Sequence, residues 1–288
     1  MEYSIKNHEV NSLTANITVP WWSFGKTVLA TAILVLVEQG KLDLETNYYG
    51  LRATLKELLQ HRSGLKDYGD FESYQLDVKN KALPWTFEEM LLRTNSDELL
   101  FEPGTEWKYS NIGYGYIRNL IVETTKMDLE GALKSLIFDK LKLTDVKVAV
   151  TSNDLKYCAY VVKNYDPGWV YHGMITGSLK SAAVFFDRLM TGEILSMESI
   201  DLMFTPHLLI IDSDDRPWKV PAYGLGMMMD MQEGNLHCMG HTGIGPGSAI
   251  AVYHFPHGKV PITVAISKNV TEEGPIEHDV VNNAKYNQ

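Results

Sequence analysis

The chain has 288 residues, of which 45% are hydrophobic, and this length suffices for one large catalytic unit or two modest domains. Its formal net charge is −10, from 26 Lys and Arg against 36 Asp and Glu. Recognition of a nucleic-acid backbone needs clustered cations, so this composition argues against nucleic acid as a partner.

The cysteines and the most apolar stretches bear on the cellular compartment. Residues 1–6 lack the apolar core of a signal peptide, and the most apolar run, residues 28–37, is shorter than the roughly 20 residues of a membrane span. The two cysteines, Cys158 and Cys238, cannot build a disulfide framework, which favours a reducing compartment. We therefore expect a cytoplasmic protein without a membrane span, provided that the first residue is the natural start.

In chain order, the sequence predicts short strands, then helices, then strands again. Residues 3–10 and 14–19 partly alternate, as strands do. Residues 27–39 predict a helix that is apolar nearly all round and therefore buried, with Gly40 placed as a C-terminal glycine cap. Further helices are expected at residues 51–60, 86–94, 112–126, 128–142, 178–190 and 197–204, strands at 236–240, 248–255 and 260–267, and a closing helix at 273–286.

Strands near both ends of the chain, with helices between them, indicate that the two ends contribute to one sheet. The fold class predicted from this order is α/β, interrupted by a mostly helical insertion. We place the sheet subdomain at residues 1–22 and 220–288 and the helical subdomain at residues 23–219. Together they would form one catalytic unit with the site at their interface.

A Ser-x-x-Lys pattern occurs twice, at Ser23–Lys26 and at Ser63–Lys66. The second pattern runs into a predicted loop, so nothing fixes its lysine one helical turn from its serine. Ser23 instead stands where the buried helix begins, and residues three apart on a helix share a face, so Lys26 can approach the hydroxyl. A buried lysine with a lowered pKa can serve as a base toward such a serine. The alternative interpretation is a capping serine beside a surface lysine.

Two later segments also contain residue types suited to a site. Tyr109 precedes Ser110 and Asn111 at a predicted helix start, where a tyrosine can enter a cleft and a cationic neighbour favours its phenolate. An aromatic staple followed by a capping residue explains the same sequence. Near the end of the chain, His241 and Thr242 lie in a glycine-rich run that lets a ligand approach the backbone, although a simple turn explains it as well.

In combination these segments resemble the three-motif signature of serine β-lactamases and penicillin-recognising DD-peptidases: Ser-x-x-Lys at Ser23, Tyr-Ser-Asn at Tyr109 and His-Thr-Gly at His241. Their order and spacing resemble the class C branch, whose relatives include esterases and acyltransferases. The likeness extends to VEQGKLDL at residues 37–44, LLQHRSGL at 58–65, FEPGT at 101–105 and YGLG at 223–226. The LLQHRSGL match accounts for Ser63 as a structural residue.

The resemblance implies a β-lactamase-like fold, with an antiparallel sheet flanked by helices, and a serine hydrolase that forms an acyl-enzyme. Ser23 would be the nucleophile, and Lys26 and Tyr109 would together accept its proton and pass it to the leaving group. Asn111 would orient Lys26 and contact the substrate amide. His241, Thr242 and Gly243 would line the edge strand that faces the substrate. The backbone N–H groups of Ser23 and Ile244 would form the oxyanion hole.

One departure concerns the substrate. His241 stands where β-lactamases usually carry lysine, and a neutral histidine holds a substrate carboxylate less firmly, which leaves esters and amides other than β-lactams and D-alanyl peptides open. An acyltransferase on the same fold and a non-catalytic binding or sensor homologue are the alternatives. We expect a small-molecule or peptide substrate and neither a metal nor another cofactor, because catalytic zinc generally needs three protein ligands. The sequence leaves the oligomeric state open.

Overall fold

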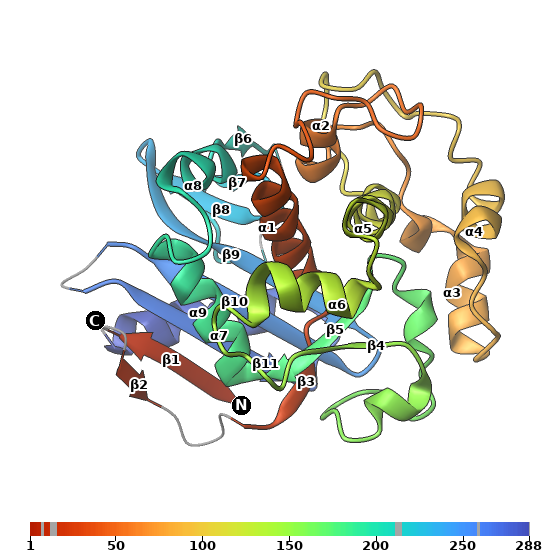
Figure 1. Cartoon of the computed structure of the whole chain (residues 1–288). Coiled ribbons are helices and arrows are strands. Elements are labelled where there is room, and N and C mark those ends of the chain that lie inside the picture. Colours follow the sequence, from red (N-terminus) through yellow and green to blue (C-terminus); the bar gives the residue numbers. More distant parts are fainter. Residues whose placement is uncertain (7–8, 12–15, 211–214, 258–259, 288) are drawn as a thin grey trace.

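The computed structural model describes residues 1–6, 9–11, 16–210, 215–257 and 260–287. Its largest element is an eight-stranded antiparallel sheet with the strand order β2-β1-β11-β10-β9-β8-β7-β6 (Figure 1). These strands are β1 (Glu2–Lys6), β2 (Glu9–Asn11), β6 (His207–Leu208), β7 (Pro221–Tyr223), β8 (Met228–Gln232), β9 (Asn235–Gly245), β10 (Ser248–Phe255) and β11 (Ile262–Lys268).

The two ends of the chain meet in this sheet, as the order of predicted elements indicated. β1 pairs with β11 in antiparallel register, with Glu2 opposite Ile266 and Lys6 opposite Ile262. The predicted α/β fold class, an antiparallel sheet flanked by helices, is therefore confirmed.

Most of the regular elements outside this sheet are helices. The α-helices are α1 (Gly25–Glu38), α2 (Leu55–Leu59), α3 (Glu72–Lys79), α4 (Phe87–Arg93), α5 (Asn111–Thr125), α6 (Leu129–Leu133), α7 (Leu179–Met190), α8 (Met197–Met203) and α9 (Glu273–Asn287). The short 3-10 helices are η1 (Trp22–Phe24), η2 (Tyr68–Asp70), η4 (Ser152–Leu155) and η5 (Pro167–Trp169), and a π-helical turn covers Lys134–Phe138. A second, three-stranded sheet has the order β3-β5-β4, from Thr18–Pro20, Met174–Ser178 and Lys147–Ala149.

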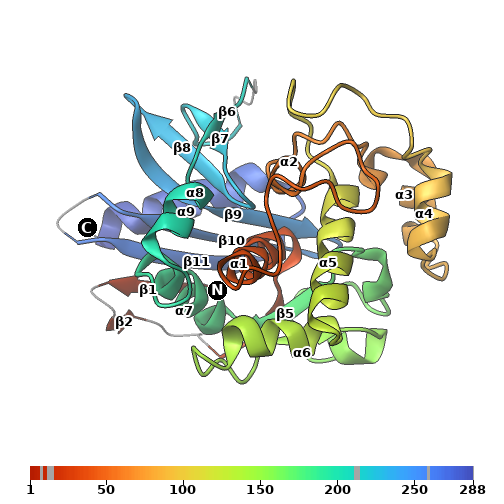
Figure 2. The ribbon, with the colours of Figure 1, turned by 45° about the horizontal axis from the view of Figure 1, so that its top comes forward.

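Both faces of the large sheet are covered, and its strands β10 and β11 are buried on both sides. Along β10, Ile250 and Val252 belong to the main hydrophobic core, on the side of α1 and α7. The alternate residues Ala251 and Tyr253 belong to a second cluster that includes Ile276 and Val280 of α9. This alternation follows from the two-residue period of a strand, and Figure 2 shows α1 and α7 together on one face of the sheet.

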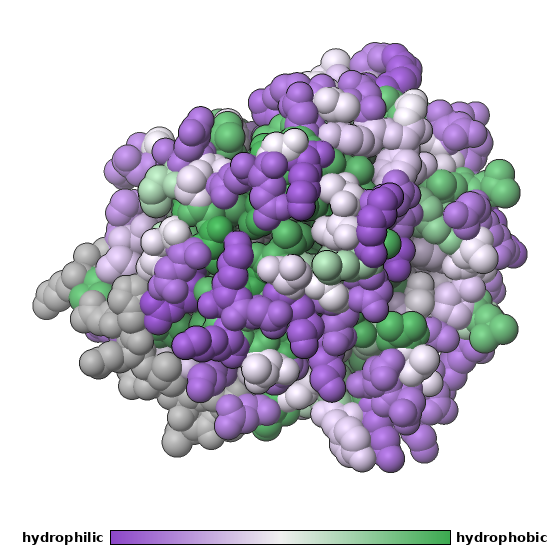
Figure 3. Space-filling model, viewed as in Figure 1, coloured by the Kyte–Doolittle hydropathy of each residue, from purple (hydrophilic) through white to green (hydrophobic). Residues whose placement is uncertain are grey.

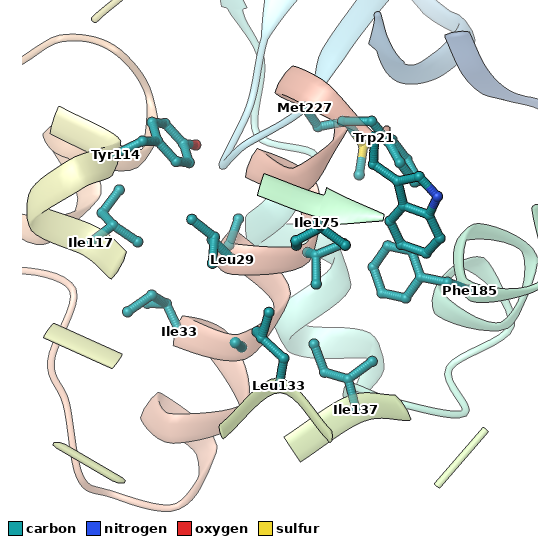
Figure 4. Packing of buried hydrophobic residues seen from close by; sticks show 14 of the residues in the cluster. Trp21, Leu29, Ile33, Tyr114, Ile117, Leu133, Ile137, Ile175, Phe185 and Met227 are labelled. Carbon is teal, nitrogen blue, oxygen red and sulfur yellow. The ribbon is translucent and has the colours of Figure 1, made fainter. Parts of the chain in front are cut away.

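Helix α1 lies at the centre of the main core, as its all-round apolar sequence predicted. Its residues from Gly25 to Leu36 are buried, and Figure 4 shows Leu29 and Ile33 among side chains from other helices and strands. The helix ends as predicted before Gly40, which has φ of 67° and donates its N–H to Val37 O at 2.8 Å. The buried position of α1 fixes everything carried at its N-terminal end.

Some predicted elements differ from the observed ones. The segment predicted as one helix over 128–142 is α6 followed by the π-helical turn. Helix α3 was not predicted because it buries no residue, so no apolar stripe marks it. Parts of the predicted strands 3–10 and 14–19 lie outside the described residues, and the described part of 3–10 belongs to the two strands β1 and β2.

The predicted division at residues 22/23 and 219/220 stays a prediction. The segment 23–219 contributes most of the helices, but it also holds β6 of the large sheet and α7, which packs against β11 and β10. The view in Figure 3 shows a surface dominated by hydrophilic side chains, with hydrophobic ones in scattered patches. Within the described ranges, no helix has the length and apolarity needed to cross a bilayer.

We predict that truncating the core of α1 destabilises the protein strongly. Ile33 is fully buried, so Ile33→Ala should lower the free energy of unfolding by about 2–5 kcal/mol, through lost burial and the cavity left behind. Leu83, which is 85% exposed, provides the matched control, and Leu83→Ala should change the value by less than about 0.5 kcal/mol. Urea unfolding followed by tryptophan fluorescence measures both, and equal effects would contradict the assigned core.

Candidate active site

Ser23 lies at the centre of η1, one turn before the buried part of α1. Its side chain is partly exposed, whereas the next turn places Lys26 in the fully buried interior. Lys26 Nζ donates to Ser23 Oγ at 3.1 Å, which is the approach that the spacing of three residues predicted. The hydroxyl is thus accessible from outside while its amine partner is not.

Asn111, the first residue of α5, connects Lys26 to a buried acid. Lys26 Nζ donates to Asn111 Oδ1 at 2.6 Å, and Asn111 Nδ2 donates to Asp67 Oδ2 at 2.9 Å. Asp67 is buried, and it also accepts from the backbone of Gly69 at 2.8 Å. The amide therefore orients the amine toward Ser23 and separates it from the carboxylate.

Burial and this carboxylate act on Lys26 in opposite directions. Burial lowers the pKa of Lys26 to about 7, because desolvation disfavours the ammonium form, while the charge of Asp67 raises it. Burial also raises the pKa of Asp67, against its hydrogen bonds from Gly69 and Asn111. A substantial fraction of Lys26 is consequently neutral near pH 7 and can accept a proton.

Tyr109 lies over the same amine. Lys26 Nζ is 4.9 Å from the centre of its ring, and a side-chain hydrogen bond joins Tyr109 to Ser23. Burial nevertheless holds the pKa of Tyr109 well above its usual value. The expectation that a cationic neighbour favours a phenolate is therefore wrong: desolvation dominates, and the group is a neutral phenol that can donate and accept.

His241 is fully buried in a chain of hydrogen bonds whose direction can be assigned. His61 Nδ1 accepts from Ser110 N at 3.0 Å, so its Nε2–H donates to the Tyr223 hydroxyl at 3.2 Å. His241 Nδ1 lies 2.6 Å from Thr242 O, a carbonyl that only accepts, so Nδ1 carries the proton. His241 Nε2 then accepts from Tyr223, at 3.0 Å.

Both histidines in this series of hydrogen bonds, His61 and His241, are neutral. Burial, and then the charge of Lys26, lowers the pKa of His241 to about 3 and that of His61 well below its usual range. His241 therefore presents neither a charge nor a free N–H group to a ligand. Its weak hold on a carboxylate stays a prediction.

Strand β9 brings the third predicted segment against Ser23. β8 pairs with β9 only as far as Gly240, so within the described residues the last five positions of β9, 241–245, pair with β10 alone. A Cβ atom on Gly243 would lie 2.6 Å from Ser23 N, so only glycine permits this approach. Ile244, the other predicted oxyanion residue, lines the pocket next to Ser23.

Thr242 requires a correction. Its side chain lies on the opposite face of β9, where the hydroxyl donates to Glu277 of α9 at 2.6 Å and is 3.0 Å from the Tyr253 hydroxyl. Side chains alternate along a strand, so the Thr242 side chain lies on the face of β9 opposite to the His241 side chain, which packs against Tyr109 and Tyr223. The predicted substrate contact of its side chain is wrong, and the residue instead anchors β9 to α9.

The peptide group between Trp22 and Ser23 is held in an unusual conformation. Trp22 has φ of 41°, in the left-handed region that a bulky residue rarely adopts. Its indole N–H donates to Ser248 Oγ at 2.9 Å, and its carbonyl oxygen is 3.3 Å from His172 Nε2. Because a carbonyl only accepts, His172 carries its proton on Nε2, and its Nδ1 has no hydrogen-bond partner among the described residues.

A pocket of about 300 Å³ opens beside Ser23. Its walls come from η2, α3, the loop before β5 and the end of β9. The lining residues are Trp22, Ser23, Tyr68, Gly69, Tyr74, Gln75, Val78, Asn111, Tyr165, Val170, His172, Ile244, Gly245 and Pro246. Four aromatic side chains in this set make the pocket suited to an apolar or aromatic group.

The second Ser-x-x-Lys pattern has different surroundings. The Ser63 hydroxyl accepts from Leu65 N at 3.3 Å, and Lys66 is directed to Asn95 O and to the exposed carboxylate of Glu98. Neither residue contacts the pocket beside Ser23. The Ser63 hydroxyl and the Lys66 amine therefore have different partners, which agrees with the prediction that nothing in this loop fixes the lysine next to the serine.

Three residues of the site were not identified as such from the sequence: Asp67, His172 and Tyr223. Asp67 and Tyr223 lie within or next to stretches already matched to the family resemblance, but nothing local marks their side chains as buried and directed toward Lys26 or His241. His172 follows an irregular segment and carries no pattern at all. Burial of a polar side chain is the signal that distinguishes them, and it appears only in the folded chain.

Comparisons with known proteins agree with this fold. A family model described as Beta-lactamase matches residues 6–284. Penicillin-binding protein 4* of Bacillus subtilis (strain 168) is 23% identical over 92% of this chain, which spans 64% of that relative's length.

Solved structures show the same fold at low sequence identity. The penicillin binding protein from Bacillus halodurans superposes with a TM-score of 0.81 at 19% identity, over 100% of this chain and 95% of that one. The D-stereospecific amidohydrolase from Streptomyces sp. gives a TM-score of 0.76 at 20% identity, over 92% and 88% of the two chains.

We predict that the Lys26 amine titrates near pH 7, as burial lowers its pKa to about 7. In Asp67→Asn the pKa should fall further, because the carboxylate charge that stabilises the ammonium is gone. Carbon-13 NMR of labelled lysine side chains measures both values. Asp70→Asn is the control, since Asp70 pairs with exposed Lys108 and should leave Lys26 unchanged. A Lys26 pKa near 10.5 in the unmodified protein would refute the assignment.

Proposed function

Because the chain belongs to the Beta-lactamase family, we propose that it is a serine hydrolase that acylates Ser23 with an amide or ester substrate. The observation that carries this proposal is the contact of 3.1 Å between the Ser23 hydroxyl and a buried lysine whose pKa is lowered to about 7. A surface lysine beside a capping serine would have neither the burial nor the lowered pKa. Hydrolase activity also agrees with the amidohydrolase among the structural relatives.

In the first step Ser23 Oγ attacks the substrate carbonyl carbon, and its proton passes to the neutral amine of Lys26. Asn111 holds that amine on the side of the hydroxyl, at 2.6 Å. As the tetrahedral intermediate collapses, the bond to the leaving group breaks. The leaving group takes a proton through the Tyr109 hydroxyl, which is replenished from Lys26, and Ser23 is left acylated. Water then attacks the ester carbonyl carbon and gives a proton to Lys26. The bond to Ser23 Oγ breaks, Lys26 returns the proton to this oxygen, and the acid is released.

The oxyanion is assigned to the N–H groups of Ser23 and Ile244. The close approach of Gly243 to Ser23 N supports this pairing, because it brings β9 against the start of η1. We assign His172 as a positioning residue: its Nε2–H holds the Trp22 carbonyl, which belongs to the same peptide group as the Ser23 N–H. A hydrogen bond at the carbonyl fixes the plane of that peptide and polarises its N–H toward the oxyanion.

The same site could transfer the acyl group to an alcohol or amine in place of water, since the first step is common to both reactions. The neutral state of His241 supports substrates whose reacting carbonyl is not followed by a carboxylate. Because penicillin-binding proteins are among the relatives, β-lactams stay candidate substrates. The resemblance to DD-peptidases keeps D-alanyl peptides as candidates as well.

We predict that a fluorophosphonate probe labels Ser23 and that Ser23→Ala abolishes the label, detected by mass spectrometry of the digested protein. The labelling rate should rise with pH to a plateau, with an inflection near pH 7, because only neutral Lys26 accepts the proton. Ser63→Ala, in the other Ser-x-x-Lys pattern, is the matched control and should label normally. An unlabelled Ser23 in folded protein would overturn the hydrolase proposal.

We predict that His172→Leu lowers kcat for a p-nitrophenyl ester on the order of 10- to 100-fold, with KM changed by less than about threefold, because the oxyanion peptide loses its support. His172→Gln, which keeps a donor near the Nε2 position, should recover most of kcat. Steady-state kinetics on variants with matched urea unfolding provide the measurement. Equal loss in both variants, or a change in KM alone, would contradict the positioning role.

A further inference from the structure

A second hollow adjoins the pocket beside Ser23. It has a volume of about 430 Å³ and shares four lining residues with the first pocket: Gln75, Val78, Tyr165 and Pro246. Its remaining walls come from the end of α3, the turn that follows α3, and the loop at residues 162–166. The two hollows are therefore neighbours, and together we call them the groove, which extends from Ser23 toward the end of α3 and the loop at residues 162–166.

On one side of this groove, the loop at residues 162–166 contacts residues that line the pocket beside Ser23. Val162 N donates to Pro246 O at 3.4 Å, directly after the end of β9, and the Tyr165 ring packs edge-on against Trp22 at 5.6 Å. The helix side is attached as well, because Gln75 Nε2 of α3 donates to Gly69 O at 2.8 Å, next to the buried carboxylate of Asp67. Both sides are thus held by contacts to residues that surround Ser23.

The rim of the second hollow is cationic although the whole chain carries a net charge of −10. Lys79 ends α3, Lys81 lies in the following turn, and Lys163 extends from the opposite loop. All three side chains are exposed, and none has an ion-pair partner among the described residues. Asp166 is the one acid among the described residues that line the hollow, and its carboxylate accepts from Gly168 N at 2.9 Å.

The floor between these lysines is apolar. Trp169 and Tyr165 are buried beneath it, while Leu83 is 85% exposed and Val162 is 43% exposed. Exposed apolar side chains under a rim of unpaired cations fit a ligand that has an apolar body and an anionic end.

We propose that the groove binds the acyl part of an extended substrate, a peptide-like amide or ester that carries a carboxylate on the chain leading away from the reacting carbonyl. The inference rests on the proposed function of Ser23 and deepens it by naming the substrate class. The carboxylate lies among Lys79, Lys81 and Lys163, and the apolar chain covers Leu83 and Val162. His241 is fully buried and neutral, so it provides no competing cation.

The test measures binding without turnover. In Ser23→Ala protein, calorimetry compares N-acyl alaninamides of both configurations whose acyl chain ends in a carboxylate with the same compounds ending in a carboxamide, over increasing chain lengths. At one or more lengths the acid should bind about three- to tenfold more tightly, and the preference should shrink as salt is raised from about 0.05 to 0.5 M.

The combined variant Lys79→Gln and Lys163→Gln should remove the preference for the acid and leave affinity for the carboxamide within about twofold. The matched control is Lys41→Gln with Lys140→Gln, which removes the same amount of charge. Both lysines lie near the C-terminal end of α1. This helix begins next to Ser23 and is about 21 Å long, so the control charges are far from the groove. The control should keep the full preference.

Equal affinity for acid and carboxamide, binding of neither, or a preference that survives in the Lys79 and Lys163 variant would overturn the proposal. Fluorophosphonate labelling of Ser23 in the unmodified protein distinguishes failure of the groove proposal from failure of the hydrolase proposal. A labelled Ser23 without acid preference rejects the groove and keeps the hydrolase. An acid preference with an unlabelled Ser23 rejects the hydrolase and keeps the groove as a binding site.

Discussion

The desolvation of the Lys26 amine is the constraint on which the rest of the site depends. An ammonium group in this interior loses its hydration, and the only carboxylate near enough to compensate, among the described residues, is Asp67 behind the Asn111 amide. A direct ion pair would keep the lysine charged and unreactive. A fully isolated lysine would be neutral but would have no fixed orientation. The intervening amide orients the amine toward Ser23 while the separation weakens the pull of the charge.

The fold supplies this arrangement by joining segments that are distant in the chain. Helix α1 is buried because its sequence is apolar on all sides, and this burial places Lys26 out of water. The sheet formed by both chain ends then delivers β9 to the start of η1, and Gly243 permits backbone contact there. Thr242 and Glu277 tie the other face of β9 to α9, so the strand is fixed from behind. The contacts that stabilise the fold are consequently also the contacts that position the residues of the site.

Neutral groups dominate the surroundings of Ser23, and the charges lie farther out. Burial keeps Tyr109, His61 and His241 uncharged, so their hydrogen bonds orient without adding a field that would return Lys26 to its ammonium form. The lysines along the neighbouring groove are exposed and hydrated, which leaves them free to meet an anionic ligand. The reactive amine of Lys26 therefore lies in a buried region away from bulk water, whereas the lysines proposed to bind the ligand lie at the exposed surface.

The sequence by itself determined the α/β fold class, the buried helix α1, the pairing of the chain ends and the proximity of Lys26 to Ser23. The fold class and the pairing of the chain ends follow from the order of the predicted elements. The buried helix and the Lys26–Ser23 contact follow from short-period patterns, namely apolar residues all round a helix and two residues one turn apart. Only the tertiary structure decided that Tyr109 is a neutral phenol, that the Thr242 side chain faces away, and that Asp67, Tyr223 and His172 belong to the site. Their roles depend on desolvation and on contacts between residues far apart in the chain, and neither quantity is encoded in local spacing.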